Sequence, residues 1–98
     1  MKIIVTGASG QLSKTIKNLF KNDFSVTFLT KDKFDITNID QINNITQNLS
    51  PDLIINTAAF TDVDKAEYFP DNAFNVNDIG VKNLAEISNK YNVKLIHV

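Results

Sequence analysis

The feature that most constrains this chain is a short apolar run that ends in a glycine turn near the amino terminus. Residues 2–6 are rich in β-branched side chains, which predicts a buried strand, and Gly7 and Gly10 follow at once. Beyond the turn, apolar residues recur at helical spacing and predict a helix over 11–21. A strand, a tight turn and a helix in this order present the first free N–H groups of the helix to an anion.

The glycine turn is therefore a candidate pyrophosphate site for a dinucleotide. Glycines let the backbone turn tightly and let a pyrophosphate approach the main chain. The spacing is Gly7-x-x-Gly10-x-x-Ser13, where Ser13 takes the place of a third glycine and is small enough for close helix packing with some loss. The residues whose main chain is expected to contact the phosphates are Ser9, Gly10, Gln11 and Leu12. A tight turn that binds no ligand is the alternative.

Composition and charge exclude several classes of function. The chain has 98 residues, a formal net charge of −1 and no arginine, so no basic patch indicates a nucleic-acid partner or an anionic membrane surface. It has no cysteine, which excludes a disulfide framework and any thiolate metal site. The first strand leaves no room for a signal peptide, and no apolar run approaches the ~18 residues of a membrane span. We expect one small cytoplasmic domain, or part of one.

Strand and helix patterns alternate along the rest of the chain. Further strands are expected at 25–29, 53–55 and 93–98, and further helices over 39–49, capped by Thr37 or Asn38, and over 71–90. Strands and helices joined by right-handed crossovers predict an α/β fold with a parallel sheet. We expect the strand order 3-2-1-4, which is the amino-terminal half of a Rossmann, or doubly wound, domain.

The sequence stops in the last residues of the fourth strand. A self-sufficient domain seldom ends in a central strand whose other edge is unpaired. We therefore expect residues 1–98 to be a cofactor-binding domain truncated after the fourth strand, with the catalytic and substrate-binding part absent. The alternative is a complete four-strand protein whose sheet edge is covered by a partner.

The tip of the second strand is expected to select the nicotinamide cofactor. An acidic residue there accepts from the ribose 2′-OH, whereas a basic one accommodates a 2′-phosphate. The tip here is Thr30, Lys31 and Asp32, and Lys31 favours NADPH over NADH, unless both charges are solvated loop residues. One short loop later, Asp35 can accept from an adenine amine and Ile36 can cover the ring face. An aspartate that only starts a helix is the alternative at that position.

Small residues follow the third strand, at 56–61, and would keep the chain close to a bound nicotinamide ribose. Ala58 and Ala59 are the smallest of them, and close packing of this loop on the first strand is the alternative. Residues 62–67 carry three carboxylates within mixed charges. These carboxylates invite a metal or acid–base interpretation, but a solvated surface is favoured over both.

The chain offers no convincing proton donor for hydride chemistry. His97 is the only histidine and lies in a predicted strand, so we expect a satisfied packing residue rather than a catalyst. Tyr91 precedes Lys94 by three positions, which does not fit a Tyr-x-x-x-Lys pair, and Tyr68 has no suitable lysine. This absence agrees with truncation.

Two runs resemble the RmlD family of extended short-chain dehydrogenases/reductases. The first is Thr-Gly-Ala-Ser-Gly-Gln-Leu at 6–12, and the second spans 51–67 and contains Asn-Thr-Ala-Ala-Phe-Thr-Asp-Val-Asp-Lys-Ala-Glu. The second run is far more specific than the glycine pattern. Matches at 73–77 and 84–85 extend the resemblance over essentially the whole chain.

This resemblance implies reduction of the C4 ketone of dTDP-4-dehydro-L-rhamnose, the last step of dTDP-L-rhamnose synthesis, by a nicotinamide cofactor. By matching position, the implied binding residues are Gly10, Gln11 and Leu12 for the pyrophosphate, Thr30 or Lys31 for the ribose, Asp35 and Ile36 for the adenine, and Ala59, Phe60 and Thr61 near the nicotinamide. The departures are Ser13 for a glycine and Thr30 for a commonly acidic residue, and the second leaves NADPH and NADH open.

In the family, the catalytic Tyr-x-x-x-Lys follows the strand matched by 94–98, so the catalytic pair and the sugar-nucleotide pocket would lie beyond Val98. A polypeptide of residues 1–98 is therefore expected to be inactive, and a dTDP-sugar or a homodimer partner belongs to a full-length protein. The alternatives are a non-catalytic NAD(P)-binding or regulatory Rossmann module and a fragment of a related nucleotide-sugar reductase or epimerase.

Overall fold

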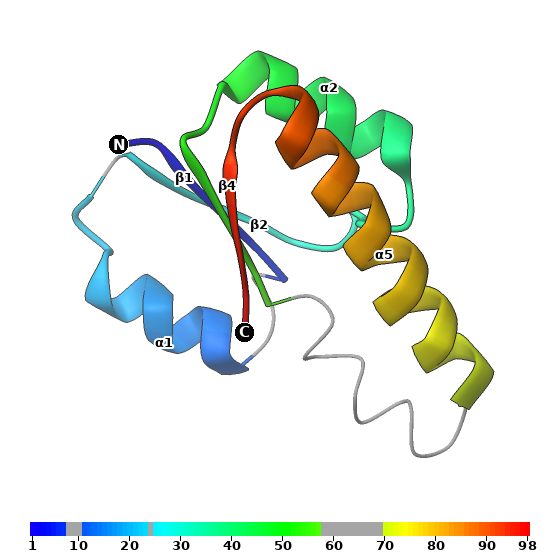
Figure 1. The fold of residues 1–98 in the computed structure, drawn as a ribbon. Coiled ribbons are helices and arrows are strands. Elements are labelled where there is room, and N and C mark those ends of the chain that lie inside the picture. Colours follow the sequence, from blue (N-terminus) through cyan, green and yellow to red (C-terminus); the bar gives the residue numbers. More distant parts are fainter. Residues whose placement is uncertain (8–10, 24, 58–69) are drawn as a thin grey trace.

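The computed structural model describes residues 1–7, 11–23, 25–57 and 70–98. The elements it describes alternate in type along the chain (Figure 1). In order, they are β1 (Ile3–Thr6), α1 (Gln11–Leu19), β2 (Val26–Leu29), α2 (Ile39–Leu49), β3 (Leu53–Asn56), α5 (Pro70–Lys90) and β4 (Lys94–His97). Every strand and helix expected from the sequence is present, with ends that differ by one or two residues, so the α/β class is confirmed.

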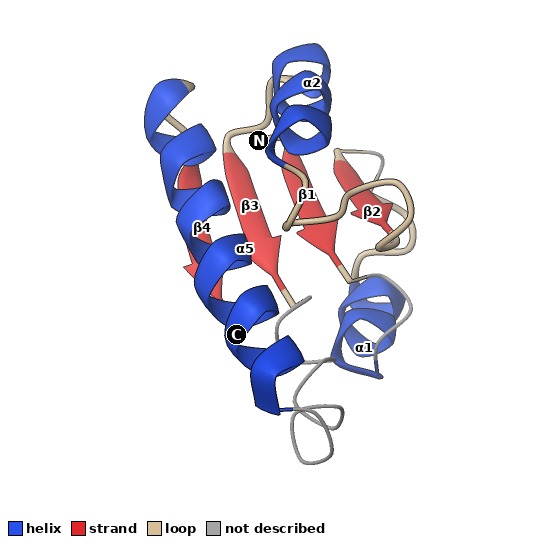
Figure 2. Ribbon diagram, turned by 90° about the vertical axis from the view of Figure 1, so that its right-hand side faces the viewer, coloured by secondary structure: helices blue, strands red, loops and turns tan. Residues whose placement is uncertain are grey.

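The four strands form one parallel sheet in the order β2-β1-β3-β4. Figure 2 shows them side by side in that order. In register, Val5 of β1 lies beside Phe28 of β2 and Ile55 of β3, and Ile55 lies beside Ile96 of β4. The expected order 3-2-1-4 is therefore wrong, because β3 pairs with β1 on the side away from β2, and β4 pairs with β3.

The connection after β2 explains this order. Phe34 and Ile36 in that connection are buried in the same cluster as Ile4 and Ile54, on the face that α2 and α5 cover. Figure 1 shows α1 on the other side of the sheet. A right-handed crossover on the face opposite α1 moves back across the sheet, past β1. The chain therefore places β3 beside β1 rather than outside β2.

The main core lies between the sheet and the two helices on this face. Its buried members are Ile4, Phe34, Ile36, Ile42, Ile54, Leu84, Ile87 and Val93. Val5 points to the opposite face, where it is also buried. Alternation along β1 therefore buries both faces of the central strand, as expected for a parallel sheet with helices on both sides.

The ends of α2 are fixed by local hydrogen bonds. Asn38 is the N-cap, and its side chain accepts from the backbone N–H of Gln41, which confirms one of the two expected caps. Ser50 ends the helix in the left-handed conformation, with φ of 47°. The N-cap is thus a residue type that favours its position, whereas Ser50 adopts the left-handed conformation at a cost.

Candidate cofactor site

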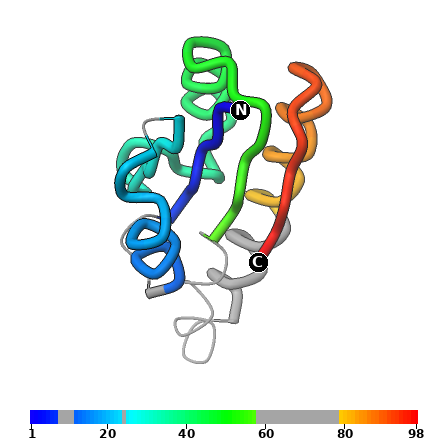
Figure 3. The backbone as a smooth tube through the Cα atoms, turned by 90° about the vertical axis from the view of Figure 1, so that its left-hand side faces the viewer, coloured from blue at the N-terminus to red at the C-terminus, as the bar shows by residue number. Residues whose placement is uncertain are grey.

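The carboxyl edge of the sheet contains a point where strand order reverses. The connection from β1 leads to β2, whereas the connection from β3 leads to β4 on the other side. Ligands of open α/β sheets bind at such a reversal, outside the carboxyl ends of the strands. Figure 3 shows β1 and β3 side by side, with the carboxyl terminus of the chain at the same edge. The structure thus brings Gly7, after β1, close to Thr57, after β3.

A buried polar network joins these two turns. The Thr6 hydroxyl donates to Asn56 Oδ1 at 2.7 Å and accepts from the Thr57 backbone N–H at 3.2 Å. The Thr57 hydroxyl donates to the Thr6 carbonyl oxygen. All three residues are buried, so each hydrogen bond forms away from water, where an unmet partner costs about 1–3 kcal/mol. The network fixes the distance between the two turns at the reversal point.

His97 extends this network to the surface. Its Nδ1 lies 3.2 Å from Asn56 Nδ2, and the Val98 backbone N–H donates to the Asn56 carbonyl oxygen at 3.1 Å. Because Asn56 Oδ1 already accepts from Thr6, the amide nitrogen of Asn56 is the atom that faces the His97 ring. The sequence predicts a satisfied packing residue at His97: its ring has a hydrogen-bond partner in Asn56, but the residue is exposed rather than packed in the core.

Gly7 has the backbone conformation that the glycine turn requires. Its φ is 70°, in the left-handed region that residues with a Cβ enter only at a cost. Gln11 starts α1 four residues later, and Ser13 is fully buried in its first turn. A small residue at 13 therefore allows the close packing expected there. Two expected phosphate contacts, Ser9 and Gly10, lie outside the described residues.

The tip of β2 forms a turn held by its own side chains. The Thr30 hydroxyl donates to the Asp32 carboxylate, and the Thr30 carbonyl oxygen accepts from the N–H groups of Lys33 and Phe34 at 3.1 and 2.9 Å. The hydroxyl of Thr30 lowers the pKa of Asp32 below its usual value, because it stabilises the charged form. Lys31 and Asp32 are both exposed, so a lysine and an anionic carboxylate stand side by side at this tip.

Asp35 and Ile36 occupy structural positions after this turn. Asp35 Oδ1 accepts from the Thr37 backbone N–H at 3.0 Å and from its hydroxyl at 2.7 Å, just ahead of α2. Ile36 is only 3% exposed and packs against Gly80 of α5. Asp35 therefore has the role of an aspartate at the start of a helix. The predicted contacts of both residues with an adenine stay predictions.

Sequence reasoning did not single out Gln41, which contacts the same loop. Its Oε1 accepts from the Asp35 N–H at 2.7 Å, and its Nε2 donates to the Asp32 carbonyl oxygen at 3.0 Å. The available signal was a glutamine three residues after an asparagine N-cap, a position from which the side chain extends toward the backbone ahead of the helix.

The remaining expected contacts, Ala58, Ala59, Phe60 and Thr61, lie outside the described residues, as do the carboxylates at 62–67. Within the described residues, no three side chains of His, Cys, Asp or Glu are placed to hold a metal ion. Over those same residues, no helix combines the length and apolarity that crossing a membrane requires.

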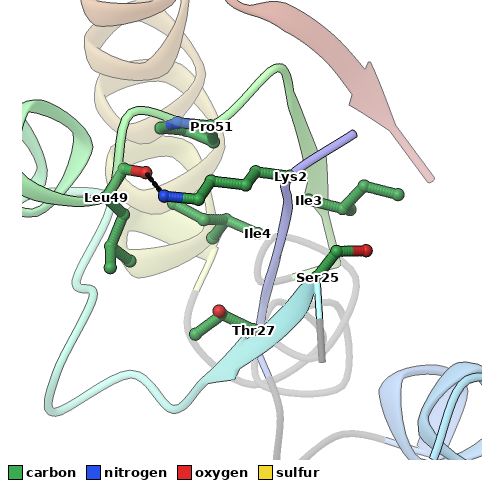
Figure 4. Close-up of a pocket in the computed structure, with 7 residues that line it drawn as sticks. All are labelled: Lys2, Ile3, Ile4, Ser25, Thr27, Leu49 and Pro51. Carbon is green, nitrogen blue, oxygen red and sulfur yellow. Dashed lines mark hydrogen bonds between the residues drawn. The ribbon is translucent and has the colours of Figure 1, made fainter. Parts of the chain in front are cut away.

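A separate small cavity lies at the opposite, amino end of the sheet (Figure 4). Its volume is about 50 Å³, far below the roughly 300–1,000 Å³ of small-molecule pockets. Lys2 Nζ crosses it to donate to the Leu49 carbonyl oxygen at 3.1 Å and so satisfies the end of α2. The residues that line it are Lys2, Ile3, Ile4, Ser25, Thr27, Leu49 and Pro51. This cavity is not part of the candidate site.

Comparison with known proteins identifies the family. The family described as the RmlD substrate binding domain matches residues 1–98. The chain belongs to this family. It is 37% identical to the dTDP-4-dehydrorhamnose reductase of Aggregatibacter actinomycetemcomitans over 99% of this chain and 34% of that protein. It is 36% identical to the enzyme of the same name from Sinorhizobium fredii, over 100% of this chain and 33% of that protein.

A solved structure agrees with this assignment. The dTDP-4-dehydrorhamnose reductase of Bacillus anthracis, in complex with NADP, superposes with a TM-score of 0.84 and 39% identity. The match covers 96% of this chain and 34% of that one. This RmlD-family chain therefore spans about a third of the length of the curated relatives it matches.

Proposed function

We propose that this RmlD-family chain is the cofactor-binding part of an NADPH-dependent reductase that acts on the C4 ketone of dTDP-4-dehydro-L-rhamnose. One observation carries the proposal: Gly7, at φ 70°, sits between β1 and α1 at the point where strand order reverses. A Cβ-free turn ahead of a helix is the arrangement that a pyrophosphate requires. The relatives named dTDP-4-dehydrorhamnose reductase supply the substrate class.

The proposed contacts follow the dinucleotide from its centre outwards. The pyrophosphate lies on the turn from Gly7 to Leu12, the adenosine ribose on Thr30 and Lys31, and the adenine on Asp35 and Ile36. The nicotinamide side lies along residues 58–61. When bound, the reduced nicotinamide supplies the hydride, and the residues of this chain bind and orient it. None of the residues proposed here is assigned the role of proton donor.

The charges next to the β2 tip favour NADPH over NADH. Exposed Lys31 and Lys33 flank Asp32 and attract a 2′-phosphate, while the anionic Asp32 opposes it. The carboxylate of Asp35 lies two residues further along the loop and accepts hydrogen bonds from Thr37, so the two lysines are the charges nearest to the tip besides Asp32. Solvent and salt weaken all of these interactions at exposed positions. A relative at 39% identity that is crystallised with NADP supports this choice. A dTDP-sugar as substrate, homodimer formation and a cytoplasmic location belong to the same proposal.

Calorimetric titration of the purified chain with NADPH and with NADH tests the proposal, and circular dichroism checks that the chain is folded. We expect micromolar binding of NADPH and weaker binding of NADH. A folded chain that binds neither contradicts the cofactor assignment, and tighter binding of NADH contradicts the role of Lys31.

A second candidate is a non-catalytic NAD(P)-binding module, because the residues proposed above bind a dinucleotide and none of them is assigned a proton transfer. Both candidates predict that residues 1–98 alone do not oxidise NADPH in the presence of dTDP-4-dehydro-L-rhamnose. The DNA sequence beyond codon 98 separates them. A Tyr-x-x-x-Lys in frame supports the reductase, and an authentic stop codon supports the binding module.

A further inference from the structure

Gln41 has an unusual role for a glutamine near the start of a helix. In a capping box, a glutamine three residues after the N-cap returns to the backbone N–H of the cap. Here the N–H of the cap residue Asn38 already donates to the Asp35 carbonyl oxygen at 2.9 Å. The Gln41 side chain therefore extends past the cap to the loop that follows β2.

The amide of Gln41 joins both ends of a short turn in this loop. Its oxygen accepts from the Asp35 N–H at 2.7 Å, and its nitrogen donates to the Asp32 carbonyl oxygen at 3.0 Å. Between these two points, Phe34 is fully buried and anchors the middle of the turn. One half-buried side chain from α2 thus bridges the backbone between the β2 tip and Asp35.

The side chains of this loop depend on that conformation. The carboxylate of Asp32 is held by the Thr30 hydroxyl, and the carboxylate of Asp35 is held by Thr37. Each of these contacts is local, so the distance between the two carboxylates is set by the backbone that joins them. The Gln41 amide bridges that backbone from α2, in addition to the burial of Phe34 in the same cluster as Ile42.

We propose that Gln41 is a positioning residue for the adenosine end of the dinucleotide, because it links the backbone of the β2 tip to that of Asp35, the two places where the ribose and the adenine are proposed to bind. This inference rests on the proposed function and adds to it a residue that itself touches no cofactor. Loss of the bridge lets the loop visit other conformations. The apparent Kd then equals the intrinsic Kd divided by the fraction of molecules whose loop keeps the binding-competent conformation.

The test is the variant Gln41→Met, which keeps the length and the helix propensity of the side chain but removes both hydrogen bonds. Gln47→Met is the matched control, because Gln47 is exposed on the same helix. Binding of 5′-AMP and of NADPH is measured by calorimetry at a temperature where circular dichroism shows every variant folded. We expect Kd for both ligands to rise about tenfold in Gln41→Met and to change less than twofold in Gln47→Met.

A contribution of Gln41 to stability alone leaves Kd unchanged at that temperature, so an unchanged Kd in folded Gln41→Met overturns the inference. If Gln41→Met does not fold, the affinities of Gln41→Glu and Gln47→Glu are compared instead. Both variants add one negative charge to α2, but only Gln41→Glu loses the N–H group that donates to the Asp32 carbonyl oxygen. Equal affinities in that pair also overturn it. A wild-type chain that binds neither ligand contradicts the proposed function instead.

Discussion

At the scale of single residues, the backbone conformation of Gly7 shapes the turn at which we propose that the pyrophosphate binds. With φ of 70°, it turns the chain from β1 toward α1 and leaves the main chain open to a phosphate. Two other residues in the described part of the chain, Ser50 and Asn92, also have positive φ, and both end helices. Gly7 differs from them because it follows a strand, at the reversal point of the sheet.

Gly7→Ala is therefore expected to lower the free energy of unfolding by about 1–2 kcal/mol, since a Cβ in the left-handed region costs roughly that much. The same change is expected to raise Kd for NADPH, because the methyl group stands where the pyrophosphate approaches. Urea unfolding and calorimetry measure the two effects. Ser50→Gly is the control, which relieves left-handed strain far from the site and should leave Kd unchanged. A Gly7→Ala chain with wild-type affinity argues against the phosphate position.

A second prediction at this scale concerns Asp32. The Thr30 hydroxyl lowers its pKa, so this contact stabilises the folded chain above the unfolded value of about 3.9 and is lost as pH falls through the lower, folded value. Thr30→Val is expected to raise the pKa of Asp32 toward its usual value, as followed by carboxyl-carbon NMR. Asp23 serves as the internal reference, because Ser25 lowers its pKa independently. An unmoved Asp32 signal contradicts the contact.

At the scale of elements, the packing of α5 against the β2–α2 connection depends on a glycine. A Cβ on Gly80 would lie 2.4 Å from Ile36 Cδ1 and 2.5 Å from Ile36 Cγ1, which is closer than atoms can approach. Asn83, one turn later on α5, donates to the Ile36 carbonyl oxygen at 3.0 Å. The helix therefore meets this connection at close range, and Ile36 is the residue that a larger side chain at 80 would displace.

Gly80→Ala is expected to destabilise the chain by about 1–2 kcal/mol. Overpacking costs about 1–3 kcal/mol, and the better helix propensity of alanine returns at most about 1 kcal/mol. Urea unfolding measures the change. Asn89→Ala, at an exposed position of the same helix, gives the propensity gain without the clash and should be neutral or stabilising. A stabilised Gly80→Ala chain shows that Ile36 moves aside without cost.

At the scale of the whole molecule, local patterns predict the elements but not their order. Apolar periodicity and caps place each strand and helix to within one or two residues, because those signals are contained in neighbouring residues. The position of β3 depends instead on which face of the sheet the connection from β2 crosses. That choice is made by the burial of Phe34 and Ile36 against Ile4 and Ile54, which are distant in sequence.

The candidate site likewise has parts that the sequence predicts and parts that it does not. The Gly7 turn is predictable, since a strand, a glycine and a helix are consecutive. The link between Thr6 and Asn56 is not, because it joins residues 50 positions apart and depends on a strand order that differs from the one expected from the sequence. Gln41 is missed for a related reason: its backward reach is predictable, but its partners depend on how the loop folds over α2.

The last prediction links this fold to its ligand. A ligand that binds only the folded chain stabilises it by RT ln(1 + [L]/Kd), so NADPH at 100 times its Kd should raise the free energy of unfolding by about 2.7 kcal/mol. Urea unfolding with and without NADPH measures this shift. At the same NADPH concentration, the Gly7→Ala chain should gain less, because its Kd is higher. Equal gains in the two chains would place the ligand away from the β1–α1 turn, and no gain in the folded wild type would contradict cofactor binding by this part of the protein.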